Sequence, residues 1–272
     1  RRGGGGLHNA GFGIGSRMAF GAQTMTKQQH ILFVNMPSLP LSNLMGGTTD
    51  RAIRAFPFGI LYLSAVLKKL GHQGHLACVD YLLQDSASFA GDLDQVIVSE
   101  AIKAMSPHDP DVLAFSFSFS PQHEFFSRSL PLLKATWPLA TVIVGGIHAS
   151  NVVEYLLQNH DIDYVVAGEA EEALPLLLSS LLRQEENHDL RGVHSRGAIR
   201  YDAARRPEIC TPPAVLDTLP FPDWSLLHAD SYMGDAVMGA QLFWDEVGAP
   251  TGRHRYASLF TSRGCPFNCT FC

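Results

Sequence analysis

Three cysteines near the end of the sequence have the spacing of metal ligands. Cys265, Cys269 and Cys272 form the pattern C-x-x-x-C-x-x-C within "TSRGCPFNCTFC". Three thiolates on one compact loop can hold either a zinc ion or an iron–sulfur cluster. Zinc sites usually add a second C-x-x-C pair or histidines, and no such second pair accompanies this one. Three cysteines on a four-iron cluster would leave one iron free to bind a substrate or a cofactor.

The composition is that of an ordinary globular chain with reduced thiols. Of the 272 residues, 46% are hydrophobic and 17% are charged, and there are five cysteines. The net charge of −6 gives no electrostatic basis for binding nucleic acid. No apolar run approaches the roughly 18 to 20 residues of a membrane span, and no secretory signal is evident. We therefore expect a cytoplasmic protein with no membrane span and no nucleic-acid partner.

Changes in composition divide the sequence into four parts. Residues 1–29 are rich in glycine and have no hydrophobic period, which predicts a disordered or upstream-translated tail. A regular apolar pattern occupies residues 30–190. Residues 191–254 contain a proline-rich stretch that is typical of a linker or of a strap across a surface, although a small hairpin could precede it. A new strand pattern begins at residue 255, so residues 255–272 are expected to open a further, truncated domain.

The pattern of residues 30–190 predicts an α/β fold with a doubly wound parallel sheet. Short apolar runs alternate five times with helical patterns, and continuous apolar runs are typical of strands buried on both faces. The expected strands span residues 31–36, 75–80, 111–118, 141–146 and 163–168. In such flavodoxin-like or Rossmann-like sheets, ligands bind outside the carboxyl ends of the strands, where the strand order reverses.

The cysteine segment resembles the cluster motif of the radical S-adenosylmethionine enzymes. The lead-in "SRGCP" and the aromatic residue before the third cysteine carry this resemblance. It implies that Cys265, Cys269 and Cys272 bind a 4Fe–4S cluster and that S-adenosylmethionine chelates the open iron. It also implies that Phe271 lies beside the bound nucleoside. A reducing electron donor would then be a partner, because one electron from the cluster cleaves S-adenosylmethionine to a radical.

From about His30 onward, the sequence is similar to the amino-terminal domain of cobalamin-binding radical S-adenosylmethionine proteins. The similar segments include "FPFGILYLSAVLKKLGH", "PDVLAFSFSFSPQ", "VIVGGIHASN", "DYVVAGEAEEAL" and "LPFPDWSLL". The resemblance implies a cobalamin domain followed by a radical S-adenosylmethionine (β/α) barrel. Of that barrel, the chain would contain the first strand and the cluster loop.

Cobalamin needs an apolar floor for its corrin and a slot for its nucleotide tail, and the loops after the strands offer candidates for both. The glycines at 145 and 146 leave room for the tail, and serines spaced by two would share one face of a strand. A simple turn and ordinary strand patterning would explain the same residues. The predicted cobalamin contacts are Ser116, Ser118, Ser120, Gly145, Gly146, His148, Gly168 and Glu169.

The loop after the first strand departs from a common cobalamin motif. Many cobalamin domains carry D-x-H-x-x-G there, and its histidine binds cobalt, whereas this loop reads "MPSLPLSNLMGG". We therefore expect base-off binding without a histidine ligand. The lower cobalt face would be vacant or would face Pro37, Ser38 or Leu39.

Other polar residues have plainer interpretations. Glu171 and Glu172 favour a helix amino terminus. His72, His75 and His123 have no matching partners in the sequence and are expected to be surface or packing residues.

The resemblance implies an enzyme that methylates an unactivated carbon or a phosphinate of a small-molecule or natural-product substrate. No catalytic residue is assigned within the chain, and the fragment is expected to be inactive because it lacks the barrel. Ring formation or oxygen insertion by the same architecture is an alternative. A non-enzymatic cobalamin sensor or carrier and a zinc-binding regulatory protein are further alternatives.

Overall fold

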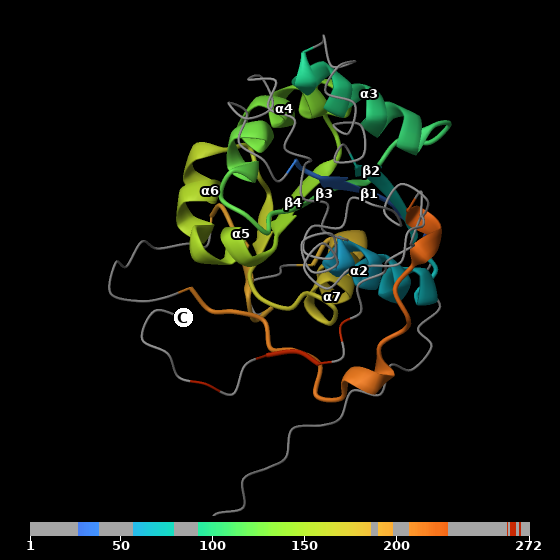
Figure 1. Ribbon diagram of the computed structural model, residues 1–272, viewed down its shortest axis with the longest axis vertical. Helices are drawn as coiled ribbons and strands as arrows, with labels where there is room; N and C mark the ends of the chain where they lie inside the picture. Colours follow the sequence, from blue (N-terminus) through green and yellow to red (C-terminus); the bar gives the residue numbers. More distant parts are fainter. Residues whose placement is uncertain are drawn as a thin grey trace, which may run out of the picture.

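The computed structural model describes residues 27–37, 57–78, 92–185, 190–197, 207–227, 260, 262–264 and 267. A six-stranded sheet in the order β2-β1-β3-β4-β5-β6 forms its centre (Figure 1). The strands are β1 (His30–Asn35), β2 (Gln73–Cys78), β3 (Val112–Ser116), β4 (Thr141–Gly145), β5 (Tyr164–Val166) and β6 (Val193–Ser195). Strands β1 to β5 are parallel, whereas β6 is antiparallel to β5. The predicted α/β parallel sheet is confirmed, and its order is flavodoxin-like, with the reversal between β1 and β3.

Helices cover both faces of the sheet, as the two-sided burial of parallel strands requires (Figure 1). One face carries α2 (Phe58–Lys69) and α7 (Ala173–Arg183). The other carries α3 (Leu93–Met105), α4 (Gln122–Thr136), α5 (Ile147–Asn151) and α6 (Val153–Asn159). Two short 3-10 helices, η2 (Leu216–Thr218) and η3 (Trp224–Leu226), follow. Among the helices that the structure describes, none combines the length and hydropathy needed to cross a bilayer.

Alternate residues of the central strands β1, β3 and β4 belong to two separate hydrophobic cores. In β1, Leu32 and Val34 belong to the core beneath α3 and α4, whereas Ile31 and Phe33 belong to the core beneath α2 and α7. All four are essentially inaccessible to solvent. Each such side chain contributes about 1.5–3 kcal/mol by burial, so the alternation fixes the strand register.

Several boundaries differ from the sequence expectations. The strand expected over 111–118 ends at Ser116, and the helix expected to begin near Ser150 is divided by Val152 into α5 and α6. Strand β6, which falls in the segment expected as a linker or hairpin, pairs with β5 instead. The remainder of that hairpin and most of the strand expected over 255–262 lie outside the described residues.

The proline-rich segment returns to the sheet as a strap (residues 207–227). The backbone N–H of Cys210 donates to the carbonyl of Ala167 at 2.7 Å, and Cys210 forms a parallel bridge with Gly168. Cys210 is buried, and burial raises the pKa of its thiol to about 11. The thiol is therefore a packing group at neutral pH.

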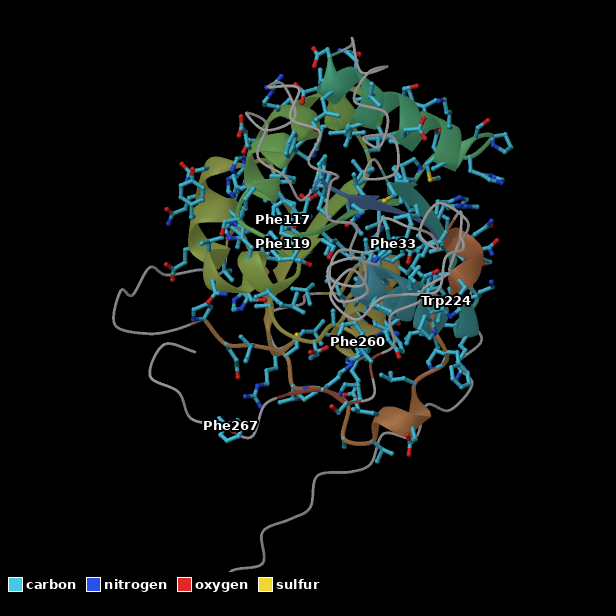
Figure 2. The ribbon with its side chains drawn as sticks, viewed as in Figure 1. Phe33, Phe117, Phe119, Trp224, Phe260 and Phe267 are labelled. Carbon is cyan, nitrogen blue, oxygen red and sulfur yellow. The ribbon has the colours of Figure 1, made fainter. Side chains whose placement is uncertain are left out.

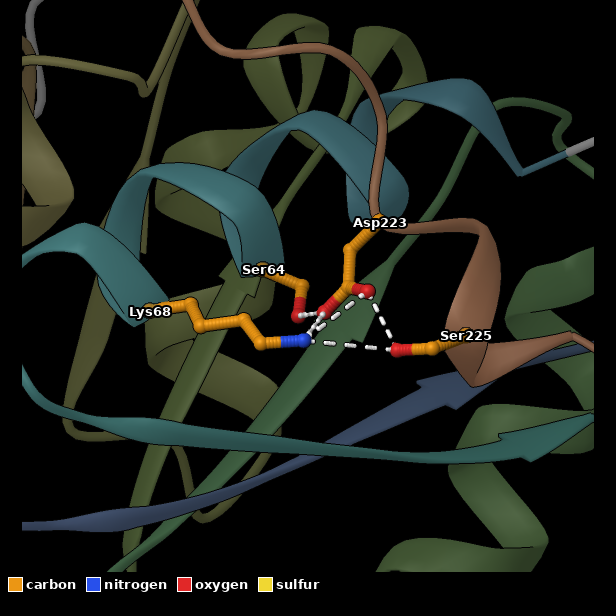
Figure 3. Close-up of polar contacts among 4 residues, drawn as sticks. All are labelled: Ser64, Lys68, Asp223 and Ser225. Atoms are coloured by element: carbon orange, nitrogen blue, oxygen red, sulfur yellow. Dashed lines mark hydrogen bonds and ion pairs between the residues drawn. The ribbon is translucent and has the colours of Figure 1, made fainter.

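The far end of the strap is fixed to α2 through Asp223 (Figure 3). Its carboxylate accepts a hydrogen bond from the Ser64 hydroxyl at 3.0 Å and lies 3.4 Å from the Lys68 ammonium. Burial opposes ionisation of Asp223, but hydrogen bonds from Ser225 and Ser64 and the charge of Lys68 outweigh it. The pKa of Asp223 is consequently lowered from its ordinary value. Next in sequence, the Trp224 ring meets the Phe58 ring edge-on at 5.8 Å.

We expect Asp223→Ala to lower the free energy of unfolding by about 1–3 kcal/mol, because it removes charge-assisted hydrogen bonds and leaves the Ser64 hydroxyl without its acceptor. Urea unfolding measures the change. The lowered pKa means that the ionised form stabilises the fold at pH 5, and that this contribution fades only below the ordinary value of 3.8. Asp217→Ala, at an exposed position of the same strap, serves as the control. Equal effects of the two substitutions would contradict the assignment.

Candidate functional site

Three adjacent strands end in small or polar residues on one face of the sheet. Asn35 lies opposite Ser116, and Ser116 lies opposite Gly145. Two residues earlier on the same face the strands carry apolar residues that are buried against α2 and α7, namely Phe33, Ala114 and Ile143. The side chains on this face therefore change from apolar to small or polar at the carboxyl edge, next to the point where the strand order reverses. This change, at Asn35, Ser116 and Gly145, is called the step below. Asn35 was missed in the sequence, although its position at the end of an apolar run is a usable signal.

Two exposed apolar side chains flank this edge. Phe119 follows β3 and is 48% exposed, and Ile147 follows β4 and is 72% exposed. Figure 2 shows Phe119 beside Phe117, which is fully buried in the core under α4. Large apolar residues that are exposed on neighbouring loops commonly mark a binding surface. Neither residue was predicted from the sequence, because both fit an ordinary apolar pattern.

The side chain of Gln122 holds the loops after β1 and β3 together. Its Oε1 accepts from the backbone N–H groups of Ser118 and Phe119, at 2.8 and 2.9 Å. Its Nε2 donates to the carbonyl of Met36 at 2.7 Å. Gln122 is only 2% exposed, so these bonds are screened from water. Sequence reasoning missed this residue, because nothing but its place at the start of α4 distinguishes it.

The three predicted serines do not share one strand face. Only Ser116 belongs to β3, where it is half-buried, whereas Ser118 and Ser120 lie in the following loop and are exposed. The expectation that residues two apart share one strand face fails beyond Ser116. The backbone N–H groups of Ser118 and Phe119 donate to the Gln122 side chain, so these residues do not continue the strand. Contacts of these serines with cobalamin stay a prediction.

Gly146 is required by the close approach of two loops. Its φ is +100°, and a Cβ atom there would lie 2.4 Å from the carbonyl oxygen of Phe117. The backbones cross at this point: Phe117 N–H donates to the Gly145 carbonyl at 2.8 Å, and His148 N–H donates to the Phe117 carbonyl at 3.0 Å. At Gly145 a Cβ atom would come no closer than 3.3 Å to its nearest neighbour, the Val166 carbonyl oxygen. The structural explanation therefore holds for Gly146, and at Gly145 a side chain would also be tight against the Val166 backbone.

The end of β5 is engaged by other parts of the chain. Gly168 has a φ of +92°, and a Cβ atom there would lie 2.7 Å from the carbonyl oxygen of Cys210 in the strap. The Glu169 carboxylate accepts from the Arg263 guanidinium at 2.8 Å. Glu171 also pairs with Arg263 instead of serving only as a helix amino-terminal charge. A cobalamin contact of Gly168 or Glu169 stays a prediction.

His148, which follows β4, belongs to a chain of polar side chains that extends from Ser120 to His160 at the end of α6. Its Nδ1 lies 3.1 Å from the Ser120 hydroxyl, and its Nε2 lies 3.4 Å from His123 Nδ1. The Nε2 of His123 lies 3.0 Å from His160 Nε2. Burial lowers the pKa of all three imidazoles, and at His123 the neighbouring His160 and His148 lower it further. The expectation that His123 is a residue without partners is wrong.

Within the described part of the chain, no group of histidine, cysteine and acidic residues is arranged to hold a metal ion. Because burial holds the pKa values of His123, His148 and His160 below 6.5, their neutral forms predominate at pH 7, and this hydrogen-bonded chain is called the histidine relay below. The predicted residues Ser38, Leu39 and Phe271 and all three cluster cysteines lie outside the described residues, whereas Pro37 is described and buried. Two open hollows lie at the opposite, amino edge of the sheet, around Asp161 and Arg196.

Residues 49–178 match the family model of the B12 binding domain. This match covers just under half of the chain, and the matched region is called the B12-binding domain below. The matched residues run from ahead of α2 into α7 and include the loops after β3, β4 and β5. Ser116, Gly145, Phe119 and Ile147 thus lie within the matched range, whereas Asn35 precedes it.

Two relatives and one solved structure extend the comparison beyond the matched domain. Cytidylyl-2-hydroxyethylphosphonate methyltransferase of Streptomyces wedmorensis is 26% identical over 240 residues, which are 80% of this chain and 43% of the relative. Anaerobic magnesium-protoporphyrin IX monomethyl ester cyclase of Cereibacter sphaeroides is 25% identical over 218 residues, 79% of this chain and 31% of the relative. The chain thus spans less than half the length of either relative.

The solved structure is the cobalamin-dependent S-adenosylmethionine radical enzyme OxsB with aqua-cobalamin and S-adenosylmethionine bound. It superposes with a TM-score of 0.51 at 15% identity, over 72% of this chain and 24% of that protein, which shows a common fold. The predicted resemblance to cobalamin-binding radical S-adenosylmethionine proteins is confirmed.

We expect Gly146→Ala to destabilise the fold by about 2–4 kcal/mol, because the added methyl group meets the Phe117 backbone and the positive φ is strained. Thermal unfolding measures the loss. Gly59→Ala is the matched control: it is an exposed position of α2 with open space around it, where alanine should be neutral or stabilise by up to about 1 kcal/mol. A Gly146→Ala protein as stable as the Gly59→Ala protein would refute the close approach.

The histidine relay predicts how stability depends on pH. The folded pKa of His123 lies below the ordinary value of 6.5, so the unfolded chain binds more protons than the folded chain once the pH falls below about 7. The free energy of unfolding should therefore decrease between pH 7 and pH 5. His123→Gln should flatten that decrease, as measured by urea unfolding at each pH, with pH 8 as the reference. An unchanged slope in the variant would exclude His123 as a contributor.

Proposed function

We propose that the whole protein is a cobalamin-dependent radical S-adenosylmethionine enzyme that transfers a methyl group to an unactivated carbon or a phosphinate of a small molecule. The observation that carries the proposal is the match of residues 49–178 to the B12 binding domain. The carboxyl edge of the sheet in this region combines the step with the exposed apolar side chains of Phe119 and Ile147. The cysteine pattern after the strap supplies the second cofactor's donor set.

The described residues fit cobalamin at this edge. Asn35, Ser116 and Gly145 present small or polar residues at the ends of three adjacent strands, where the nucleotide tail could approach the sheet. Phe119 and Ile147 are exposed apolar surfaces suited to the corrin. A few polar groups next to exposed apolar side chains are the composition expected of a cofactor site.

Each part of the chain has a distinct task in this proposal. Gln122 and the Gly146 crossing hold the loops in place before the cofactor arrives. The thiolates of Cys265, Cys269 and Cys272 would hold a 4Fe–4S cluster and leave one iron for S-adenosylmethionine. When bound, cobalamin would carry the transferable methyl group, and the cluster with S-adenosylmethionine would supply the radical that activates the substrate. A reducing protein partner would supply electrons.

Ring formation is a second candidate, and the cyclase from Cereibacter sphaeroides favours it. The phosphonate methyltransferase relative has a slightly higher identity and covers more of its own length, which favours methyl transfer. Both candidates need the same cobalamin domain. They differ in what the substrate-binding part of the whole protein would hold.

The purified chain should bind hydroxocobalamin at one equivalent, with a base-off absorption spectrum. After reduction, the cobalt(II) electron paramagnetic resonance spectrum should show no splitting from a histidine nitrogen. Absorbance titration measures the stoichiometry and affinity. Ser116→Leu should weaken binding by at least about tenfold, because a leucine side chain fills the step beside Asn35 and Gly145.

Thr136→Leu is the matched control, since this exposed position lies at the far end of α4. It should bind cobalamin like the unaltered chain. Folding of both variants is checked by circular dichroism. Failure of the folded, unaltered chain to bind cobalamin would overturn the proposed function, and equal binding by Ser116→Leu would move the site away from the step.

A further inference from the structure

Arg263 connects the segment that leads into the cysteines with the carboxyl edge of the B12-binding domain. Its Nη1 lies 2.6 Å from Glu171 Oε1 and 2.8 Å from Glu169 Oε2. Its guanidinium carbon stands 4.9 Å above the centre of the Tyr62 ring. Three side chains, one from α2 and two from the loop between β5 and α7, thus surround a residue that lies two positions before Cys265.

The burial of the two carboxylates shows which contact dominates. The Glu171 side chain is 4% exposed and its Oε2 has no hydrogen-bond partner, whereas the Glu169 side chain is 45% exposed. A buried carboxylate is costly unless a cation compensates its charge. The Arg263 guanidinium provides that compensation, and stacking on the Tyr62 face adds a cation–π contribution. The buried, ionised Glu171 side chain therefore depends on the positive charge of Arg263 for its stability.

A second contact also attaches this segment to the B12-binding domain. The Phe260 ring meets the Phe58 ring of α2 edge-on at 4.6 Å. Beyond Arg263, the two described residues are open to solvent: a Cβ atom on Gly264 would have nothing within 4 Å, and Phe267 is 76% exposed. Among the described residues 260, 262–264 and 267, Phe260 and Arg263 therefore provide the contacts that can hold this segment on the domain.

We propose that Arg263 is a positioning residue that fixes the cysteine segment against the carboxyl edge of the B12-binding domain. Its guanidinium, held by Glu171 and Glu169 above Tyr62, sets where the following cysteines begin relative to the cobalamin edge. This inference rests on the proposed function, because the cysteines are the cluster ligands only within that proposal. The ion pair itself can be tested without any cofactor.

Trypsin provides a direct test, because it cleaves after an arginine only when that side chain enters the S1 pocket of the protease. An Arg263 side chain held by Glu171 must first be released. We expect Glu171→Gln to speed cleavage of the Arg263–Gly264 bond by about tenfold relative to other tryptic sites in the same digest, which corresponds to about 1.4 kcal/mol of release. Mass spectrometry of the time course measures the rate.

Glu172→Gln is the matched control, since it removes the same charge from the neighbouring, exposed position. It should leave the rate at Arg263 unchanged. Equal rates in the unaltered chain and in both variants would overturn the proposal. If Glu171→Gln accelerates cleavage at every site, Tyr62→Leu decides instead: selective acceleration at Arg263 by about twofold to fivefold supports the proposal, and no acceleration refutes it.

A spectroscopic measurement separates positioning from mere stability. In the chain reconstituted with iron, sulfide and cobalamin, a reduced cluster near cobalt(II) broadens the cobalt resonance. Glu171→Gln should reduce that broadening at unchanged cobalamin and iron content, and Glu172→Gln should not. Equal broadening in all three proteins would refute positioning. A chain that binds no cobalamin would defeat the proposed function, whereas the trypsin result would still decide the Arg263 contact.

Discussion

The parallel pairing of β1 to β5 is the constraint on which the rest of the molecule depends. Parallel neighbours need a connection that crosses a face of the sheet, and both faces here are covered by helices over separate cores. The faces are therefore closed to a large ligand. All five carboxyl ends lie at one edge, and the order β2-β1-β3-β4-β5 places the reversal between β1 and β3. Asn35 and Ser116 lie side by side at that point.

This edge is organised before any cofactor binds. The backbone crossing at Gly146 ties the loop after β4 to the loop after β3, and Gln122 ties the loop after β3 to the end of β1. Because these bonds are made within the protein, little ordering of these loops remains for the binding step.

The sequence predicted most of the sheet, because continuous apolar runs and the helices between them are local features. The fold pattern also indicated the carboxyl edge as the place for a ligand, which stays a prediction, and the resemblance pointed to the cofactors. It could not predict where β3 ends, because that depends on Gln122 reaching Met36, which is 86 residues away in sequence. The histidine relay is equally hidden, since His123, His148 and His160 meet only after α4, α5 and α6 are placed on one face. No spacing in the sequence connects Glu171 with Arg263.

Helix α2 acts as the meeting surface between the B12-binding domain and the described parts of the later chain. Its inward residues Ile60 and Leu67 are buried in the core against the sheet. The same helix receives Asp223 at Ser64 and Lys68, Phe260 at Phe58, and Arg263 at Tyr62. Residues 58 and 62, and residues 64 and 68, are each one helical turn apart, so the strap and the segment before the cysteines contact two stripes of one helix. The position of both segments relative to the carboxyl edge is therefore set by the packing of one helix on the sheet.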